Sequence, residues 1–162
     1  MHLMQTAYLL TGGNMGNREL HLAQAKELIA AQCGQVVAAS ALYETAAWGN
    51  THQPAFLNQV LQLKTPLKAR PLMRRLLQIE AQMGRIRKEK YGPRIIDIDI
   101  LLFNGEIHQQ RHLTIPHPQL PFRRFALLPL AALAPLLKHP ILKKNINCLL
   151  ATCNDKLAVK KI

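Results

Sequence analysis

The sequence predicts a single α+β domain in which helices pack on a mixed or antiparallel β-sheet. Segments with strand-like and helix-like apolar patterns follow one another in the order β-α-β-β-α-β-β-α, which departs from the strict alternation of a parallel α/β fold. The chain of 162 residues has the size of one ordinary domain, and 49% of its residues are hydrophobic, enough to bury a core without disulfides. Because no linker, internal repeat or low-complexity run interrupts it, we expect one domain over residues 1–162.

A first strand is expected over Met4–Thr11, followed by a glycine-rich turn at residues 12–16 and a helix that runs to about Cys33. Either Asn14 or Asn17 can cap this helix, because an asparagine side chain accepts hydrogen bonds from the free amides of the first turn. The helix should bury a face that carries the following residues: Leu20, Ala23, Leu28 and Ile29. The turn GGNMG is neither the G-x-G-x-x-G nor the Walker motif, so it predicts a tight connection rather than a phosphate cradle.

Two more strands and a loop are expected before the second helix. Gln35–Thr45 is rich in valine and alanine and predicts one strand, and the glycine and proline of Ala46–Pro54 predict a loop. Phe56–Lys64 alternates with the period of a strand, so its side chains should divide between two faces. One face carries Leu57, Leu61 and Leu63, and the other carries Phe56, Asn58 and Val60.

The second helix and the strand after it have the clearest patterns in the chain. Pro71 suits the first turn of a helix, Gly84 ends it, and apolar residues recur between them at helical spacing. These apolar residues are Leu72, Leu76, Ile79 and Met83. Arg85–Arg94 predicts a basic loop, and Ile95–Phe103 predicts a strand.

The C-terminal third is expected to contain a hairpin return and two helices. Asn104-Gly105 predicts a two-residue hairpin turn that returns through Glu106–His108. Arg124–Leu133 and Asn145–Thr152 predict helices, the first bent by its internal proline. The sequence assigns no role to the basic segment 156–162, for which a solvated end is one option.

The formal net charge of +12 predicts an anionic partner: nucleic acid, a membrane surface or a phosphorylated small molecule. The charge is unevenly distributed. Residues 64–94 and 111–162 are strongly basic, whereas residues 95–110 contain Asp97, Asp99 and Glu106 and no lysine or arginine. A site that binds polyphosphate together with its metal ion needs cations around a small group of carboxylates.

Membrane and secretory roles are disfavoured. No apolar stretch reaches the roughly 20 residues needed to cross a bilayer, and residues 1–10 lack the basic start and long apolar centre of a signal peptide. The three cysteines make an odd number without metal-binding spacing, which is typical of a reduced, cytoplasmic protein.

Asp97 and Asp99 are the strongest candidates for a metal site. Residues i and i+2 of a strand share a face, so both carboxylates should point the same way while Ile98 points into the core. Mg²⁺ in proteins is held by one or two carboxylates together with phosphate oxygens and water. The alternative, two acids on a solvated strand face, is weakened by the cations of the preceding loop: Arg85, Arg87, Lys88, Lys90 and Arg94.

Other candidates stay open when judged by residue type alone. His117 stands between Pro116 and Pro118, which restrict its backbone and suit a positioned ligand-binding side chain, but a lone loop histidine is more often structural. Phe56 and Asn58 share a strand face and could stack on and hydrogen-bond a flat heterocycle. They could also be a core phenylalanine beside a surface asparagine.

A basic nucleic-acid-binding module is the alternative from a different class of protein. It explains the net charge but not the acidic pair between the two basic segments. Tyr91 is the only aromatic residue of the basic loop, whereas proteins that bind single strands usually interleave several stacking rings with the charge.

The motif at residues 84–100, GRIRKEKYGPRIIDIDI, resembles the signature of the 6-hydroxymethyl-7,8-dihydropterin pyrophosphokinase family of folate biosynthesis. Further blocks resemble the same family in the same order: residues 8–17, 43–58, 113–117 and 123–130. The resemblance implies a ferredoxin-like α+β fold and the transfer of pyrophosphate from ATP to the pterin hydroxymethyl group, with release of AMP. It also implies a cytoplasmic monomer that has neither nucleic acid nor a membrane as a partner.

The resemblance further implies roles for individual residues. Two Mg²⁺ ions would be held by Asp97 and Asp99, which with Arg85 and Arg94 would form the catalytic group. ATP would be bound by Gln78, Glu80, Arg87, Lys90, Tyr91, Ile100, Thr114, His117 and Arg123. The pterin would be bound by Thr45, Trp48, Phe56, Asn58 and Phe125, with the two phenylalanines on either side of its ring.

Overall fold

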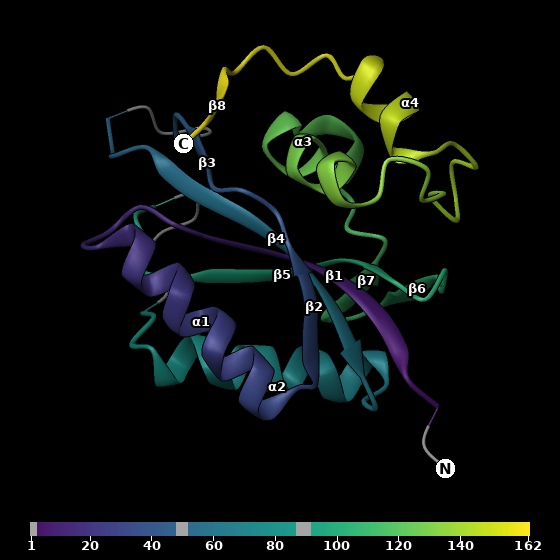
Figure 1. The fold of residues 1–162 in the computed structure, drawn as a ribbon, viewed down its shortest axis with the longest axis horizontal. Helices are drawn as coiled ribbons and strands as arrows, with labels where there is room; N and C mark the ends of the chain where they lie inside the picture. Colours follow the sequence, from purple (N-terminus) through teal and green to yellow (C-terminus); the bar gives the residue numbers. More distant parts are fainter. Residues whose placement is uncertain (1–2, 48–51, 87–91) are drawn as a thin grey trace.

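The fold has three layers, with a six-stranded antiparallel sheet between two pairs of helices (Figure 1). The computed structural model describes residues 3–47, 52–86 and 92–162. One face of the sheet is covered by α1 (Arg18–Gln32) and α2 (Ala69–Gln82). The other is covered by α3 (Arg124–Leu133) and α4 (Ile146–Ala151). None of the described helices is long and apolar enough to span a bilayer.

The central sheet has the strand order β5-β1-β4-β3-β8, and β2 pairs with the other end of β4. Its strands are β1 (Gln5–Gly13), β2 (Gln35–Ala39), β3 (Tyr43–Thr45), β4 (Phe56–Thr65), β5 (Asp97–Phe103) and β8 (Val159–Lys161). A separate two-stranded ribbon consists of β6 (His108–Gln110) and β7 (Leu113–Ile115), and the 3₁₀ helix η1 (Leu120–Phe122) follows it. Every strand pair is antiparallel, so the predicted α+β class is confirmed.

Helix α1 begins where the sequence predicts but buries a different face. The side chain of Asn17 caps it by accepting a hydrogen bond from the Leu20 amide at 3.1 Å. The buried residues are Leu22, Ala25 and Ile29, whereas Leu20 and Ala23 are exposed. The prediction for those two was wrong, because a step of two residues turns a helix by about 200°, and Leu20 therefore points away from Leu22.

Helix α2 agrees with its prediction. Leu72, Leu76 and Ile79 are buried against the sheet, and Met83 packs at the edge of the same core. Gly84 follows the helix with φ of +90°, a conformation that glycine adopts without a steric cost.

The single strand predicted over residues 35–45 is two strands. The break falls at Ser40, whose amide donates to the Val60 carbonyl and whose hydroxyl accepts from the Val60 amide, each at 2.9 Å. Because the Ser40 side chain takes the place of a backbone acceptor, the chain leaves the ladder and rejoins β4 at Tyr43. Strand β4 itself alternates as predicted, with Leu57 and Val60 in cores on opposite faces of the sheet.

The turn predicted after β5 is present, but the predicted pairing of the two segments that flank it was wrong. Asn104 and Gly105 both have positive φ, 56° and 70°, as a two-residue turn requires. The segment after the turn pairs with β7, whereas β5 pairs with β1. Asn104 favours this arrangement by donating its amide to the Thr6 carbonyl and accepting from the Thr6 amide, at 2.9 and 3.0 Å.

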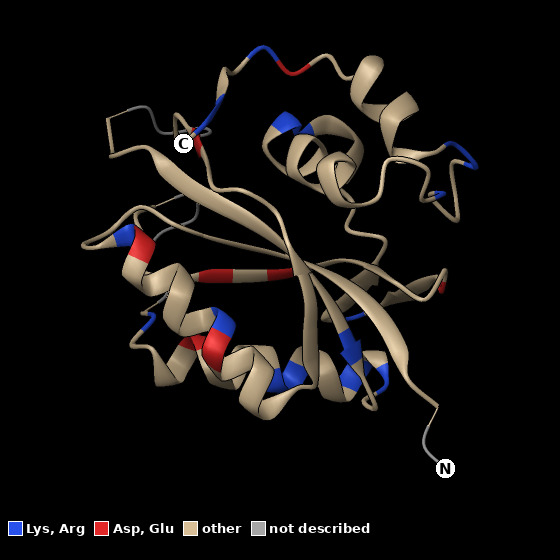
Figure 2. Ribbon diagram, in the orientation of Figure 1, with Lys and Arg blue, Asp and Glu red and all other residues tan. Residues whose placement is uncertain are grey.

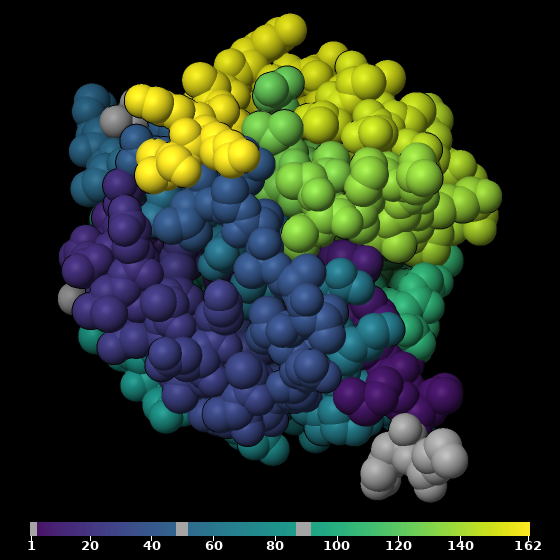
Figure 3. All heavy atoms as spheres, in the orientation of Figure 1, coloured from purple at the N-terminus to yellow at the C-terminus, as the bar shows by residue number. Residues whose placement is uncertain are grey.

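The C-terminal segment is not merely a solvated end. Residues 159–161 form β8, which pairs with β3, and the Ile162 amide donates to the Leu42 carbonyl at 2.9 Å. In the space-filling view this segment, in yellow, lies against the blue residues near β3 (Figure 3). The sequence does not predict β8, because a strand of three residues, two of them lysine, has almost no apolar pattern, although lysine is common on edge strands.

Gly13 ends β1 where two backbone segments come close together. A Cβ added there would lie 2.2 Å from the Ile95 carbonyl oxygen and 3.0 Å from its carbon. Because backbone cannot rotate away, we expect Gly13→Ala to lower the free energy of unfolding by about 1–3 kcal/mol. Urea unfolding of the two proteins measures this difference, and coincident transitions would contradict the close approach.

Candidate active site

The floor of the candidate site is a row of residues across three strands. Asn58 of β4 pairs with Gly12 of β1, and Gly12 pairs in turn with Asp97 of β5. A Cβ on Gly12 would lie 2.1 Å from Nδ2 of Asn58. The glycine therefore lets the Asn58 side chain lie across the β1 backbone, from where a larger residue at position 12 would displace it.

The site lies at the end of the sheet face that α3 covers. Leu10 and Val60 on this face pack under α3, whereas Gly12 and Asn58, two residues away on the same strands, lie where polar groups begin. The open pocket has about 650 Å³ of empty space. It is lined by Leu10, Gly12, Thr45, Ala46, Phe56, Asn58, Arg94, Asp97, Asp99, Arg123 and Phe125.

Asp97 and Asp99 both line this pocket, as the strand period predicts. Burial raises the pKa of Asp99 to about 8, and the negative charges of Asp97 and Glu80 add to the effect, while Arg123 and Arg85 oppose it. In Figure 2 the acidic residues of β5 are drawn in red within the sheet. Crowded carboxylates of this kind fit a divalent cation, which would remove their mutual repulsion.

Arg85 joins the second helix to the acidic pair. Its Nη1 lies 3.2 Å from Oε1 of Glu80 and also donates to Oδ1 of Asp97. Burial lowers the pKa of Arg85, but the charges of Asp97 and Glu80 raise it by more, so the guanidinium stays charged. Oε2 of the buried Glu80 accepts from the Ile98 amide at 2.6 Å. Glu80 on α2 thus holds Arg85 by an ion pair and β5 by a hydrogen bond.

Arg94 links the acidic pair to the aromatic part of the pocket. Its Nη1 donates to Oδ2 of Asp97 at 3.1 Å, and its Nε and Nη2 donate to the Gly92 carbonyl at 3.1 and 2.9 Å. The same guanidinium lies 5.2 Å from the centre of the Phe56 ring. One side chain therefore contacts both the anionic and the aromatic groups of the site.

The aromatic part has polar atoms suited to a heterocycle. Phe56 and Phe125 both line the pocket, and the Arg123 guanidinium lies 5.6 Å from the Phe125 ring centre. Within the described residues, the buried Oδ1 of Asn58 and Oγ1 of Thr45 have no hydrogen-bond partner. Leaving buried polar atoms unpaired is costly, so these two atoms indicate a ligand with polar edges.

The residues expected to bind ATP are less concentrated. Arg123 lines the pocket, but Gln78 on α2 and Thr114 on β7 are exposed outside it. Ile100 is 2% exposed in the core on the face opposite the aspartates, so its side chain does not reach the pocket. Four expected ligand-binding residues lie outside the described part of the chain: Trp48, Arg87, Lys90 and Tyr91.

Pairing of strands, which residue types do not reveal, explains the lining residues that the sequence reasoning missed. Leu10, Gly12 and Ala46 line the pocket without being candidates from the sequence. Gly12 lies beyond the expected end of the first strand, and only the observed pairing places it between Asn58 and Asp97.

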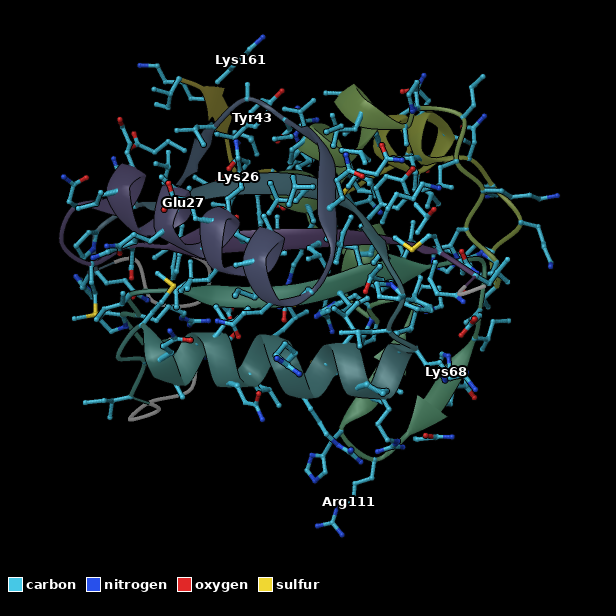
Figure 4. All side chains as sticks on the ribbon, turned by 60° about the horizontal axis from the view of Figure 1, so that its bottom comes forward. Lys26, Glu27, Tyr43, Lys68, Arg111 and Lys161 are labelled. Carbon is cyan, nitrogen blue, oxygen red and sulfur yellow. The ribbon has the colours of Figure 1, made fainter. Side chains whose placement is uncertain are left out.

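Much of the positive charge lies away from this pocket. In Figure 4, Lys68 and Arg111 project at one edge of the molecule, and Lys161 projects from β8 at the opposite edge. The pocket itself is lined by Arg94 and Arg123 together with two carboxylates. The net charge thus points to an anionic ligand but exceeds what the site uses.

His117 follows β7 and is half-buried. Burial lowers its pKa to about 4, and the charge of Arg123 acts in the same direction. Its Nδ1 accepts a hydrogen bond from the Gln119 amide at 3.1 Å, so the neutral ring carries its proton on Nε2. We predict that NMR titration finds His117 neutral, with Nε2 protonated, throughout about pH 5–8. A pKa at or above the ordinary 6.5 would contradict this.

Comparison with known proteins gives consistent matches over most of the chain. A family model described as 7,8-dihydro-6-hydroxymethylpterin-pyrophosphokinase (HPPK) matches residues 8–135. A Methylorubrum extorquens protein named 2-amino-4-hydroxy-6-hydroxymethyldihydropteridine pyrophosphokinase is 44% identical over 133 residues, which are 82% of this chain and 84% of that protein. An Aquifex aeolicus protein of the same name is 39% identical over 144 residues, 89% of each chain.

A solved structure shares the fold. Wild-type HPPK-DHPS from Plasmodium falciparum superposes with a TM-score of 0.73 at 19% sequence identity. The match covers 93% of this chain and 45% of that longer one, so this chain spans less than half of the solved protein.

Proposed function

The chain belongs to the 7,8-dihydro-6-hydroxymethylpterin-pyrophosphokinase family and transfers pyrophosphate to hydroxymethyldihydropterin in folate biosynthesis, and we propose that its donor is ATP bound with two Mg²⁺ ions. The observation that carries this proposal is the composition of one pocket. Two same-face carboxylates and the guanidinium of Arg94 lie beside two phenylalanines and an unpaired amide oxygen. A triphosphate suits the first set of groups, and a flat, polar-edged pterin suits the second.

Asp97 and Asp99 would hold the metal ions. When bound, Mg²⁺ neutralises triphosphate charge and fixes the position of its oxygens. Asp97 is already held in place by Arg85 and Arg94, so its carboxylate needs little reorganisation. The pKa of Asp99 is raised by burial and by the charges of Asp97 and Glu80, so its carboxylate would gain from a neighbouring cation.

Arg85 and Arg94 would stabilise the charge that develops around the β-phosphorus. A guanidinium stays charged at any relevant pH and donates two parallel hydrogen bonds to phosphate oxygens. Phosphoryl-type transfer depends mainly on such positioning and charge stabilisation. ATP would also be bound by further residues: Arg123, Gln78, Glu80, Thr114 and His117. Ile100 would bind it through its backbone alone.

The pterin would lie between Phe56 and Phe125. The Oδ1 of Asn58 and the hydroxyl of Thr45 would then gain hydrogen bonds from its edge. Its hydroxymethyl oxygen attacks the β-phosphorus, the bond between that phosphorus and the oxygen bridging to the α-phosphorus breaks, and AMP leaves with the bridging oxygen. Asp97, whose side chain is 27% exposed, would accept the hydroxyl proton.

We propose that the protein acts as a cytoplasmic monomer without nucleic-acid or membrane partners. All three cysteines are free, and Cys148 is exposed, which suits a reducing compartment. Sedimentation equilibrium tests the monomer, and a dimer at assay concentrations would contradict it.

Nucleotide products distinguish this reaction from its alternatives. The protein would be incubated with ATP, Mg²⁺ and reduced hydroxymethylpterin, and nucleotides would be separated by chromatography. We expect AMP in a 1:1 ratio with pterin diphosphate and no reaction after metal chelation. ADP, or no product with authentic substrates, would contradict the proposal. Tight, salt-sensitive binding of DNA or RNA without turnover would favour the nucleic-acid alternative.

A further inference from the structure

Asn14 is a buried polar residue between β1 and α1 whose side chain faces inward. Only 2% of its surface is exposed. It belongs to the glycine-rich turn 12–16, but it does not form a phosphate cradle there, because its polar atoms are used within the protein. Those atoms join two separate segments of the candidate active site.

The first segment is the loop that leads into the aromatic part of the pocket. Nδ2 of Asn14 donates to Oε1 of Gln53 and to the Pro54 carbonyl, both at 2.9 Å. Two residues after Pro54, β4 begins with Phe56. The loop end is further held by Arg18, which donates to the Ala55 carbonyl at 3.0 Å. Asn14 therefore helps fix where the Phe56 ring stands.

The second segment is the backbone that carries Arg94. The Arg94 amide donates to Oδ1 of Asn14 at 2.9 Å, and the Asn14 amide donates to the Arg94 carbonyl at 3.0 Å. Two bonds to one residue fix both the position and the direction of its backbone. The Arg94 side chain then reaches Asp97 and the face of the Phe56 ring.

We propose that Asn14 is a positioning residue that couples the pterin side of the pocket to the phosphate side. Its amide donates to the loop before Phe56, and its carbonyl oxygen accepts from Arg94, so a shift of either segment is transmitted to the other. Binding of pterin against Phe56 thereby favours the Arg94 position that serves the triphosphate, and the reverse holds by thermodynamic reciprocity. This inference rests on the proposed ATP-dependent function.

The coupling is measured as the ratio of pterin dissociation constants without and with a non-hydrolysable ATP analogue and Mg²⁺, by isothermal titration calorimetry. We expect the wild type to bind pterin more tightly with the analogue present. Asn14→Ala should lose most of this ratio, an effect of about 5–50-fold, and kcat should fall with it.

Two further variants divide the contacts, and the milder Gln53→Ala keeps the test valid if Asn14→Ala does not fold. Asn14→Asp keeps the acceptor for Arg94 but turns a carboxylate oxygen toward the Gln53 and Pro54 oxygens, so it should lose the coupling as Asn14→Ala does. Gln53→Ala removes one contact on the loop side and should reduce the coupling ratio by less. Circular dichroism would verify that each variant is folded.

Asn17→Ala is the matched control. Asn17 stands three residues away and caps α1 through the Leu20 amide. Its loss should lower stability and leave the coupling ratio unchanged. Wild-type coupling in folded Asn14 variants, equal loss in Asn17→Ala, or no coupling in the wild type would each overturn the inference. If the wild type binds neither ligand, the proposed function fails instead.

Discussion

Replacing either β5 aspartate by alanine is expected to lower kcat by about 10²–10³-fold, because each change removes a charge that is preorganised for the metal and triphosphate. The fold should persist. Asp99 is partly buried, and burial and neighbouring acids raise its pKa to about 8, so ionising this carboxyl group opposes folding in the absence of a cation. Metal-free Asp99→Asn should consequently be at least as stable as the wild type.

Two measurements on these variants distinguish metal binding from a structural role. Added Mg²⁺ should raise the melting temperature of the wild type and have little effect on Asp99→Asn. Glu106→Gln is the matched control, because Glu106 follows β5, is partly exposed and lies outside the pocket lining. Full activity in both aspartate variants, or equal loss in the control, would refute their role as metal ligands.

Arg85→Ala should have the next largest effect, with kcat lowered by about 10²-fold or more. Removing this guanidinium also leaves Glu80, whose side chain is 4% exposed, without its charged neighbour at 3.2 Å. Removing one partner of a buried ion pair is costly, so the free energy of unfolding should fall by about 3 kcal/mol or more. Steady-state kinetics and urea unfolding measure the two effects separately.

Conservative and distant changes make the result specific. Arg85→Lys keeps a charge but loses the two-pronged geometry, and it should recover stability more than activity. Arg74→Ala removes the same charge from an exposed position of α2 and should change neither quantity appreciably. Unchanged turnover in Arg85→Ala would contradict its place beside the reacting phosphate.

Local patterns predicted those parts of the fold whose signal lies within a few residues. Helix α3 spans Arg124–Leu133 as expected, and β5 carries both aspartates into one pocket, because the strand period alone determines their common face. The β5–β6 hairpin was wrong because Asn104 bonds to β1, a partner remote in sequence. Strand β8 was missed because its stability comes from the edge of β3 rather than from its own residues.

In the candidate site, too, local patterns predicted some residues, and contacts between remote segments determined the others. Phe56, Asn58 and the aspartates were identifiable from residue type and alternation. Gly12 was not, because its importance comes from standing between Asn58 and Asp97 in a row that exists only after the strands pair. Asn14 was seen only as a possible helix cap, since its partners lie in two other segments, near Gln53 and at Arg94.

The fate of the β-phosphorus tests the central claim most directly. The protein would be given ATP labelled with ³²P in its β-phosphate, together with Mg²⁺ and reduced hydroxymethylpterin. If the pocket transfers pyrophosphate, the label will appear in the pterin product, and unlabelled AMP will form in equal amount. Label retained in ADP, with only the γ-phosphate transferred, would contradict the account.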